Sequence, residues 1–151
     1  MLATIKKDIH LRAQFEHLNH LKDKSLKSEM SAVILEGSFY HSSSVHCSYY
    51  SVLQLMKHFC LSENNITEIA FSSNKPQITG NHVYVLDEFL KLLDSKYVSS
   101  EDQRAFKRLV NDLKHVRVEA DYKNTPCEQL VGIAAKEKAD QILKEINKYF
   151  G

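Results

Sequence analysis

Glycine and proline are the residues that this sequence most clearly lacks. The chain has 151 residues with 4 Gly and 2 Pro, whereas average usage would supply about 18 of the two together. Because β-sandwiches, barrels and loop-rich chains depend on these residues for their turns, such folds and disorder are disfavoured. The composition predicts instead a single all-α domain, residues 1–151, built from long helices and few turns.

The sequence also lacks an excess of one charge, a cysteine framework and a long apolar run. Lys+Arg number 20 and Asp+Glu 19, so nucleic acid cannot be held by bulk charge, although a local basic patch could hold it. The odd number of cysteines, without C-x-x-C spacing, suggests free thiols in a reducing compartment. No segment resembles a signal peptide or reaches the roughly 18 apolar residues of a membrane span. We therefore expect a soluble, cytoplasmic protein with no membrane contact.

Apolar residues recur at helical spacing over most of the chain. The polar run 22–29 could bend or break the first helix, and residues 1–23 could form a helical extension. Residues 62–80 hold a Pro and a Gly with little periodicity, and are predicted to be the one long loop. The pattern predicts an antiparallel, up-and-down bundle of four to five helices. These helices are expected over residues 5 to about 35, 41–61, 81–97, 100 onward and 126–150.

Local sequence signals predict where three of these helices begin or end. Gly37 is expected to end the first helix. Ser100–Gln103 has capping-box spacing and is expected to open the fourth helix. Thr125–Glu128 offers an N-cap Thr, a Pro at the first helical position and a Glu at the third, which predicts the start of the last helix. Gly132 does not fit this scheme, because it lies inside the last helix.

Arg117 is the most informative single residue. On a helical wheel it falls about 20° from Phe106, along the apolar face of its helix. A guanidinium buried there without a partner would be costly. Asp121, four residues on, is the obvious local partner, and the pair could simply orient the helix end. Alternatively, Arg117 lines a cleft or a dimer seam and contacts phosphate or RNA.

The second predicted helix combines small and aromatic residues. Small side chains allow close helix approach, as in a tight bundle or a dimer contact, although helix propensity alone would favour other residues. Tyr49 lies on the apolar stripe and Tyr50 is turned about 100° away, so one is expected in the core and the other beside a second surface. The small residues are Ser42, Ser43, Ser44, Ser48 and Ser51.

The histidines give weaker signals. His17 and His20 could bind a metal from one helix face, but no third ligand is near them, so an exposed polar face is favoured. We predict no metal and no other cofactor. His46 and Cys47 are adjacent, so they point about 100° apart on a helix and cannot pair as base and nucleophile. The sequence also has no phosphate-binding glycine loop and no serine-nucleophile elbow.

Three segments occur in an order that is typical of one helical family. In residues 35–59, LEGSFYHSSSVHCSYYSVLQLMKHF, a helix ends at a Gly and a double-Tyr helix follows. Residues 80–89, GNHVYVLDEF, are similar to a T-H-x-x-V-x-x-x-F stretch. Residues 113–124, LKHVRVEADYKN, are similar to an L-x-x-x-R-x-x-A-D-Y signature. Together they resemble the HEPN (higher eukaryotes and prokaryotes nucleotide-binding) domain superfamily, over about residues 24–150.

The resemblance implies a helical bundle that forms a homodimer, often beside a nucleotidyltransferase-type partner in a toxin–antitoxin or defence module. Active members are metal-independent ribonucleases with an R-x(4–6)-H motif. Arg117 matches the Arg, but residues 118–127 contain no His. The resemblance therefore implies a non-catalytic or weakly catalytic protein that binds RNA, a nucleotide or the protein partner. The expected ligand-binding residues are Arg117, Asp121, Tyr122, Tyr50 and Tyr49.

Two other functions stay open on the sequence. One is a metal-independent ribonuclease whose general base comes from another helix. His46 is the better candidate for it, because His115 points about 160° away from Arg117. The other is a structural dimeric adaptor without affinity for nucleic acid, which the near-neutral charge allows.

Overall fold

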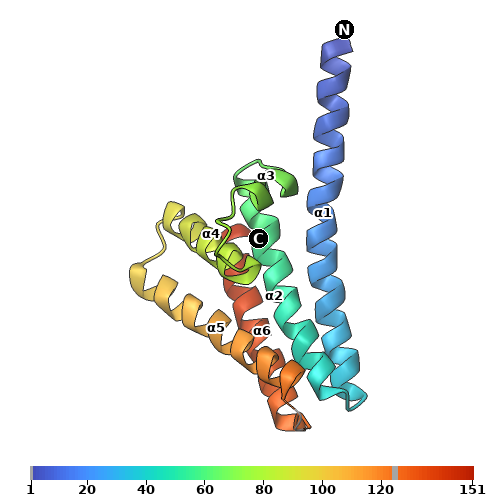
Figure 1. The fold of residues 1–151 in the computed structure, drawn as a ribbon, viewed down its shortest axis with the longest axis vertical. Coiled ribbons are helices and arrows are strands. Elements are labelled where there is room, and N and C mark those ends of the chain that lie inside the picture. Colours follow the sequence, from blue (N-terminus) through green and yellow to red (C-terminus); the bar gives the residue numbers. More distant parts are fainter. Residues whose placement is uncertain (1, 124–125) are drawn as a thin grey trace.

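The described part of the chain folds into a bundle of six α-helices (Figure 1). The computed structural model describes residues 2–123 and 126–151, with side chains for all of these except 2–15, 17 and 18. No strand occurs within these two ranges. The all-α bundle is confirmed, with six helices where four or five were predicted. The helices are α1 (Leu2–Gly37), α2 (His41–Glu63), α3 (Glu68–Ser73), α4 (Asn81–Ser95), α5 (Ser100–Tyr122) and α6 (Gln129–Phe150).

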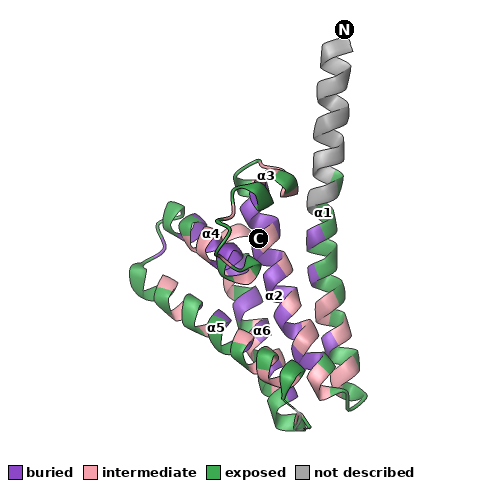
Figure 2. Ribbon diagram, viewed as in Figure 1, coloured by how far each residue is buried: buried purple, intermediate pink, exposed green. Residues whose placement is uncertain are grey.

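α2 is the central helix of the bundle. It packs against α1, α4, α5 and α6, and Figure 2 shows buried residues along most of its length. α1 and the oblique α5 run one way along the long axis, whereas α2 and α6 run the other way (Figure 1). Apolar residues at helical spacing on α2, α4, α5 and α6 face the core, although Val131 near the start of α6 is 39% exposed. Their largest fully buried side chains include Tyr49, Met56, Phe89, Leu113 and Ile142.

Small residues line the contact between α1 and α2. Ser25 Oγ donates to the carbonyl oxygen of Ser51 at 2.7 Å, and Ser44 Oγ donates to that of Ala32 at 2.9 Å. Hydroxyl groups can reach the backbone of a neighbouring helix only where the two helices lie close together. Ser48 lies on the same face of α2 as Ser44 and Ser51 and is 1% exposed. The close approach expected from the serine-rich segment is therefore confirmed.

α1 is one unbroken helix that ends where the sequence predicted. Its last residue is Gly37, and the chain reverses through Phe39, whose φ of 65° is in the left-handed region. The polar run 22–29 continues the helix without a break. Ser25, in the middle of this run, is 4% exposed and bonds to α2. A polar stretch can therefore stay helical here because its small residue packs against a neighbouring helix.

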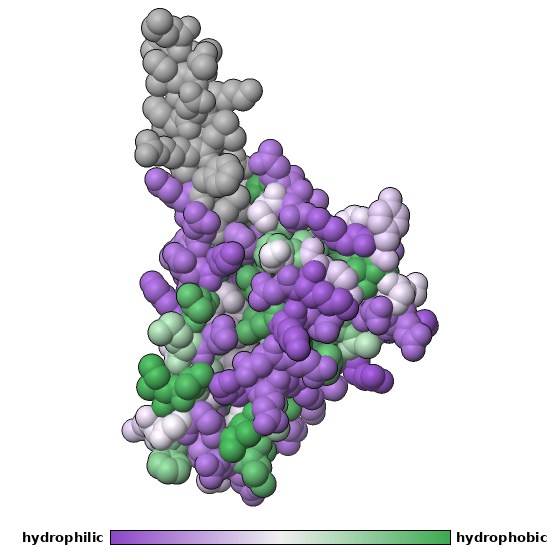
Figure 3. Space-filling view, turned by 180° about the vertical axis from the view of Figure 1, so that it is seen from behind, coloured by the Kyte–Doolittle hydropathy of each residue, from purple (hydrophilic) through white to green (hydrophobic). Residues whose placement is uncertain are grey.

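The N-terminal part of α1 projects past the other helices (Figure 1). Residues 1–23 were predicted as a helical extension, but the projection ends before Leu21, which is 3% exposed and belongs to the core. Leu11, Phe15 and Leu18 are apolar residues at helical spacing in α1, and their side chains lie outside the described residues. Further along, α1 keeps a second apolar strip at the surface, and Figure 3 shows apolar side chains along this part of the molecule. The strip consists of Leu26, Met30, Val33 and Ile34, each at least half exposed.

The segment predicted as one long loop contains a helix, α3. Its N-cap is Thr67, whose Oγ1 accepts a hydrogen bond from the backbone N–H of Ala70 at 3.2 Å. Glu68 occupies the first turn, where a negative charge is favoured. Phe71 is its one buried residue. Six residues with a single buried side chain have no measurable period, so the pattern along the sequence could not reveal this helix.

One predicted helix start is confirmed and another is wrong. α5 begins at Ser100 as predicted, and its cap is the preceding residue, Ser99, whose Oγ accepts from the N–H of Asp102 at 3.1 Å. The last helix begins at Gln129 after an extended Glu128 without a side-chain capping bond, and Thr125 lies outside the described residues. A Pro at the first helical position permits a helix start but does not impose one.

Gly132 has a packing role that explains its place inside a helix. The first turns of α6 pass over the end of α1 and the start of α2. A β-carbon at this position would collide with Glu36 Oε2 and lie 3.3 Å from Cβ of His41. The Glu36 carboxylate faces Nδ1 of His41 at 3.0 Å, and both side chains are largely buried. The missing side chain of Gly132 therefore leaves room for the contact between Glu36 and His41.

Candidate functional site

Arg117 is paired as its spacing predicted. Its Nε lies 2.7 Å from Oδ2 of Asp121, one turn further along α5. The N–H is not directed at that oxygen, so the contact is ionic rather than a formed hydrogen bond. The Arg117 side chain is only 13% exposed. Because water screens this charge poorly, it acts strongly on the groups around it.

Asp121 also joins α5 to α2. Its Oδ2 and Oδ1 lie 3.2 Å and 3.4 Å from Nδ1 of His46. One carboxylate is therefore shared by a guanidinium and an imidazole. Such a contact fixes the orientation of the imidazole ring and leaves its Nε2 for other partners. No spacing along the chain predicts the contact between His46 and Asp121, although His46 was the candidate general base for this site.

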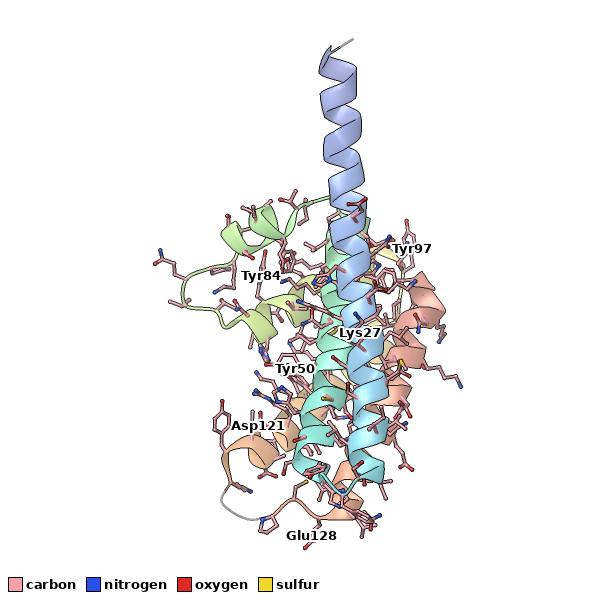
Figure 4. The ribbon with its side chains drawn as sticks, turned by 90° about the vertical axis from the view of Figure 1, so that its right-hand side faces the viewer. Lys27, Tyr50, Tyr84, Tyr97, Asp121 and Glu128 are labelled. Atoms are coloured by element: carbon pink, nitrogen blue, oxygen red, sulfur yellow. The ribbon has the colours of Figure 1, made fainter. Side chains whose placement is uncertain are left out.

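Aromatic rings surround the Arg117 guanidinium. Its Cζ lies 5.5 Å from the ring centre of Tyr50 and 5.9 Å from that of Tyr122, both within cation–π range. Tyr50 in turn stacks on His46, with ring centres 4.5 Å apart. Figure 4 shows Tyr50 and Asp121 on the same side of the bundle. We call Arg117, Asp121, His46, Tyr50 and Tyr122 the Arg117 cluster.

Behind this cluster, Tyr49 is buried against His82 of α4. The Tyr49 hydroxyl lies 2.9 Å from Nδ1 of His82, and the two rings are stacked. Burial, reinforced by Tyr50, raises the pKa of Tyr49, so the hydroxyl keeps its proton and can donate it to Nδ1. Burial, followed by the charges of Arg117 and Lys114, lowers the pKa of His82. Tyr49 is thus the core member of the tyrosine pair, and Tyr50 borders the surface.

The lowered pKa of His82 predicts a loss of stability in mild acid. The unfolded chain binds a proton more readily than the folded one, so the contribution is complete above about pH 6.5 and is lost as the pH falls. We expect urea unfolding to show a smaller free energy at pH 5 than at pH 7.5, with a weaker pH dependence in His82→Gln. The exposed His115→Gln is the control. An unchanged pH dependence in His82→Gln would contradict this assignment.

Two hollows adjoin the cluster: Tyr50 lines one of them, and His46 and Asp121 line the other. One, of about 300 Å³, lies between α2, α3 and α4 and includes Tyr50 and His82 in its wall. The other, of about 430 Å³, lies between α2 and α5. Burial raises the pKa of the Cys47 thiol in this second hollow, which disfavours a thiolate nucleophile. Its wall consists of Ser42, Ser43, His46, Cys47, Ala120 and Asp121.

The other candidate residues lie elsewhere. His115 is exposed and its Nε2 lies 3.6 Å from Oε1 of Glu119, away from the Arg117 cluster. His17 lies outside the described side chains. No three His, Cys, Asp or Glu side chains gather around a metal-sized position in the described part of the chain. Sequence reasoning did not place His82 or Lys114 at this site. His82 matches the His of the T-H-x-x-V-x-x-x-F stretch, which could have drawn attention to it, whereas Lys114 does not stand out in residue type or spacing.

Within the described residues, no helix combines the length and the apolar character that crossing a membrane requires. The resemblance to HEPN domains stays a prediction from three sequence motifs. Comparison of the chain with protein-family models, with curated proteins and with solved structures found no match.

Proposed function

We propose that the Arg117 cluster binds the phosphate group of a nucleotide, either free or within single-stranded RNA. The observation that carries this proposal is a largely buried guanidinium whose one carboxylate partner is shared with His46. The Asp121 carboxylate also contacts Nδ1 of His46, and no described group accepts a hydrogen bond from the Nε of Arg117. Arginine is the side chain best suited to hold a phosphate through paired N–H donors.

The local charge supports binding of an anion. Arg117 and Lys114 are both close enough to His82 to lower its pKa, and both come from α5. Asp121 is the carboxylate that contacts Arg117. The whole chain carries only +1, so any attraction for phosphate must come from such a local excess rather than from the general surface.

The exposed aromatic ring of the cluster supports a nucleotide rather than another anion. Tyr122 is 74% exposed and lies beside the guanidinium. An exposed ring next to a cation is the combination by which proteins bind single-stranded nucleic acids, since bases stack on the ring while the phosphate meets the charge. The resemblance of residues 113–124 to the HEPN signature is consistent with a ligand at this position.

Titration of a short, labelled single-stranded RNA, followed by fluorescence anisotropy, tests the proposal. We expect binding at low salt that weakens about 3- to 7-fold between roughly 50 and 200 mM salt, as one or two phosphate contacts would give. Competition by unlabelled nucleoside monophosphates will distinguish a free nucleotide from an RNA ligand. Absence of binding to either compound would contradict the proposal and favour the structural adaptor.

The contact between His46 and Asp121 favours a second candidate function, RNA cleavage without a metal. Asp121 holds Nδ1 of His46, so Nε2 is available to accept a proton from a ribose 2′-hydroxyl. Arg117 would stabilise the charge that develops on the phosphate. The His46 side chain is 44% exposed, so RNA can reach it.

For this second function, we expect His46→Ala to slow cleavage of labelled RNA about 100-fold or more. RNA affinity should change less than about threefold, because His46 would act in the chemical step. Gel analysis in the presence of a metal chelator is the measurement, and the exposed His115→Ala is the control. RNA left intact by the wild-type protein would exclude ribonuclease activity and leave the binding proposal in place.

A further inference from the structure

The hollow between α2, α3 and α4 adjoins the Arg117 cluster. Tyr50 and His82 belong to its wall, and Cζ of Arg117 lies 5.5 Å from the centre of the Tyr50 ring. Its volume of about 300 Å³ lies at the lower end of the range for small-molecule sites. A group held at Arg117 can therefore extend past Tyr50 into this hollow, which has room for one ring system of moderate size.

The wall of the hollow is partly aromatic. Phe71 of α3 and Tyr84 of α4 are both buried, and their ring centres are 4.7 Å apart. Figure 4 shows Tyr84 on the same side of the bundle as Tyr50. Aromatic surfaces of this kind favour a flat ligand, because stacking buries the face of the ligand ring against the face of the side-chain ring. α3, which the sequence did not reveal, supplies Phe71 and so closes this side of the hollow.

Two side-chain amides give the wall hydrogen-bonding capacity. Gln54 of α2 and Asn81 of α4 line the hollow, and neither side chain makes a hydrogen bond to another residue that the structure describes. An amide presents a donor and an acceptor side by side, which matches the edge of a nucleobase. The lysines nearby are already engaged. Lys57 pairs with Glu68, and Lys75 Nζ donates to the carbonyl oxygen of Thr79 at 2.7 Å.

We propose that this hollow receives the base of the nucleotide whose phosphate binds Arg117. The inference rests on the proposed function, and it adds that the protein recognises the base of the nucleotide as well as its phosphate. The base would lie against the aromatic wall, and the amide of Gln54 would bond to its edge. Phosphate binding at Arg117 would then supply affinity for any nucleotide, whereas the hollow would distinguish a nucleotide from a sugar phosphate.

Calorimetric titration with the four nucleoside 5′-monophosphates and with ribose 5-phosphate tests this inference. We expect at least one nucleotide to bind about tenfold or more tightly than ribose 5-phosphate, since stacking of one base contributes about that much or more. Gln54→Leu should weaken that nucleotide about 3- to 10-fold, the effect of one net hydrogen bond, and leave ribose 5-phosphate unchanged. The exposed Gln141→Leu is the matched control.

The outcomes separate the two proposals. Equal affinity for nucleotides and ribose 5-phosphate would overturn the base site and leave the phosphate site intact. Nucleotide binding that is lost in Gln54→Leu but kept in Arg117→Met would support the base site and contradict the phosphate site. No binding of any of these compounds would overturn both. Should Gln54→Leu fail to fold, Asn81→Ala tests the other amide of the same wall. A loss of nucleotide affinity with ribose 5-phosphate unchanged would support the base site, and unchanged nucleotide affinity would contradict it.

Discussion

Arg117→Met is expected to lower the affinity for single-stranded RNA by about 30- to 150-fold, equivalent to about 2 to 3 kcal/mol. Methionine keeps much of the length of the side chain but removes the charge and all five N–H donors. Hydrogen bonds to a charged group contribute about this much when both partners are partly shielded from water. The measurement is fluorescence anisotropy at low salt, where the electrostatic contribution is largest.

Two further variants make this experiment specific. Arg108→Met removes an exposed arginine from the same helix and should change the affinity by less than about threefold. Arg117→Lys keeps the charge but loses the forked donor geometry, so its affinity should lie between those of the wild type and Arg117→Met. Asp121 keeps His46 as a partner in both Arg117 variants. An affinity for RNA that is the same in all of them would place the ligand elsewhere on the molecule.

Two substitutions of Ser48 are expected to change the free energy of unfolding in opposite directions. Its Oγ is buried and has no hydrogen-bond partner among the described residues. Ser48→Ala removes this unsatisfied group and favours the helix, so we expect the free energy of unfolding to rise by about 1 kcal/mol. Ser48→Leu adds three carbon atoms to a face of α2 that lies close to α1, and should lower it by about 3 kcal/mol.

Urea unfolding at neutral pH measures both changes. Ser43→Leu is the matched control, because it makes the same replacement at an exposed position of α2 and should stay within about 0.5 kcal/mol of the wild type. If Ser48→Leu left the free energy of unfolding unchanged, α1 and α2 would be able to separate at little cost. A loss of stability in Ser48→Ala would show that the hydroxyl has a partner in solution, such as a bound water.

Much of the fold was predictable because it depends on residues close together in the sequence. The inward positions of Phe89, Leu113 and Ile142 follow from helical spacing alone. The end of α1 at Gly37 follows from local chemistry. The start of α6 was predicted at residue 126 and lies at Gln129, because several residues in this segment can begin a helix and tertiary packing selects among them.

The site was predictable only where it lies within one helix. Arg117 and Asp121 are four residues apart on α5, so their contact follows from helix geometry. His46 lies 75 residues from Asp121, and Tyr49 lies 33 residues from His82. Both of these contacts join different helices. Spacing within a helix contains no information about which helices become neighbours or how they are rotated, so these partners required the structure.

Gly132 has a consequence for anyone who would engineer this protein. A glycine in the interior of a helix is usually the first position chosen for stabilisation, because alanine gains about 1 kcal/mol in helix propensity. Here an added methyl group would meet the Glu36 carboxylate and displace it from His41. Stabilising designs for α6 should therefore use exposed positions of the helix and leave this glycine unchanged.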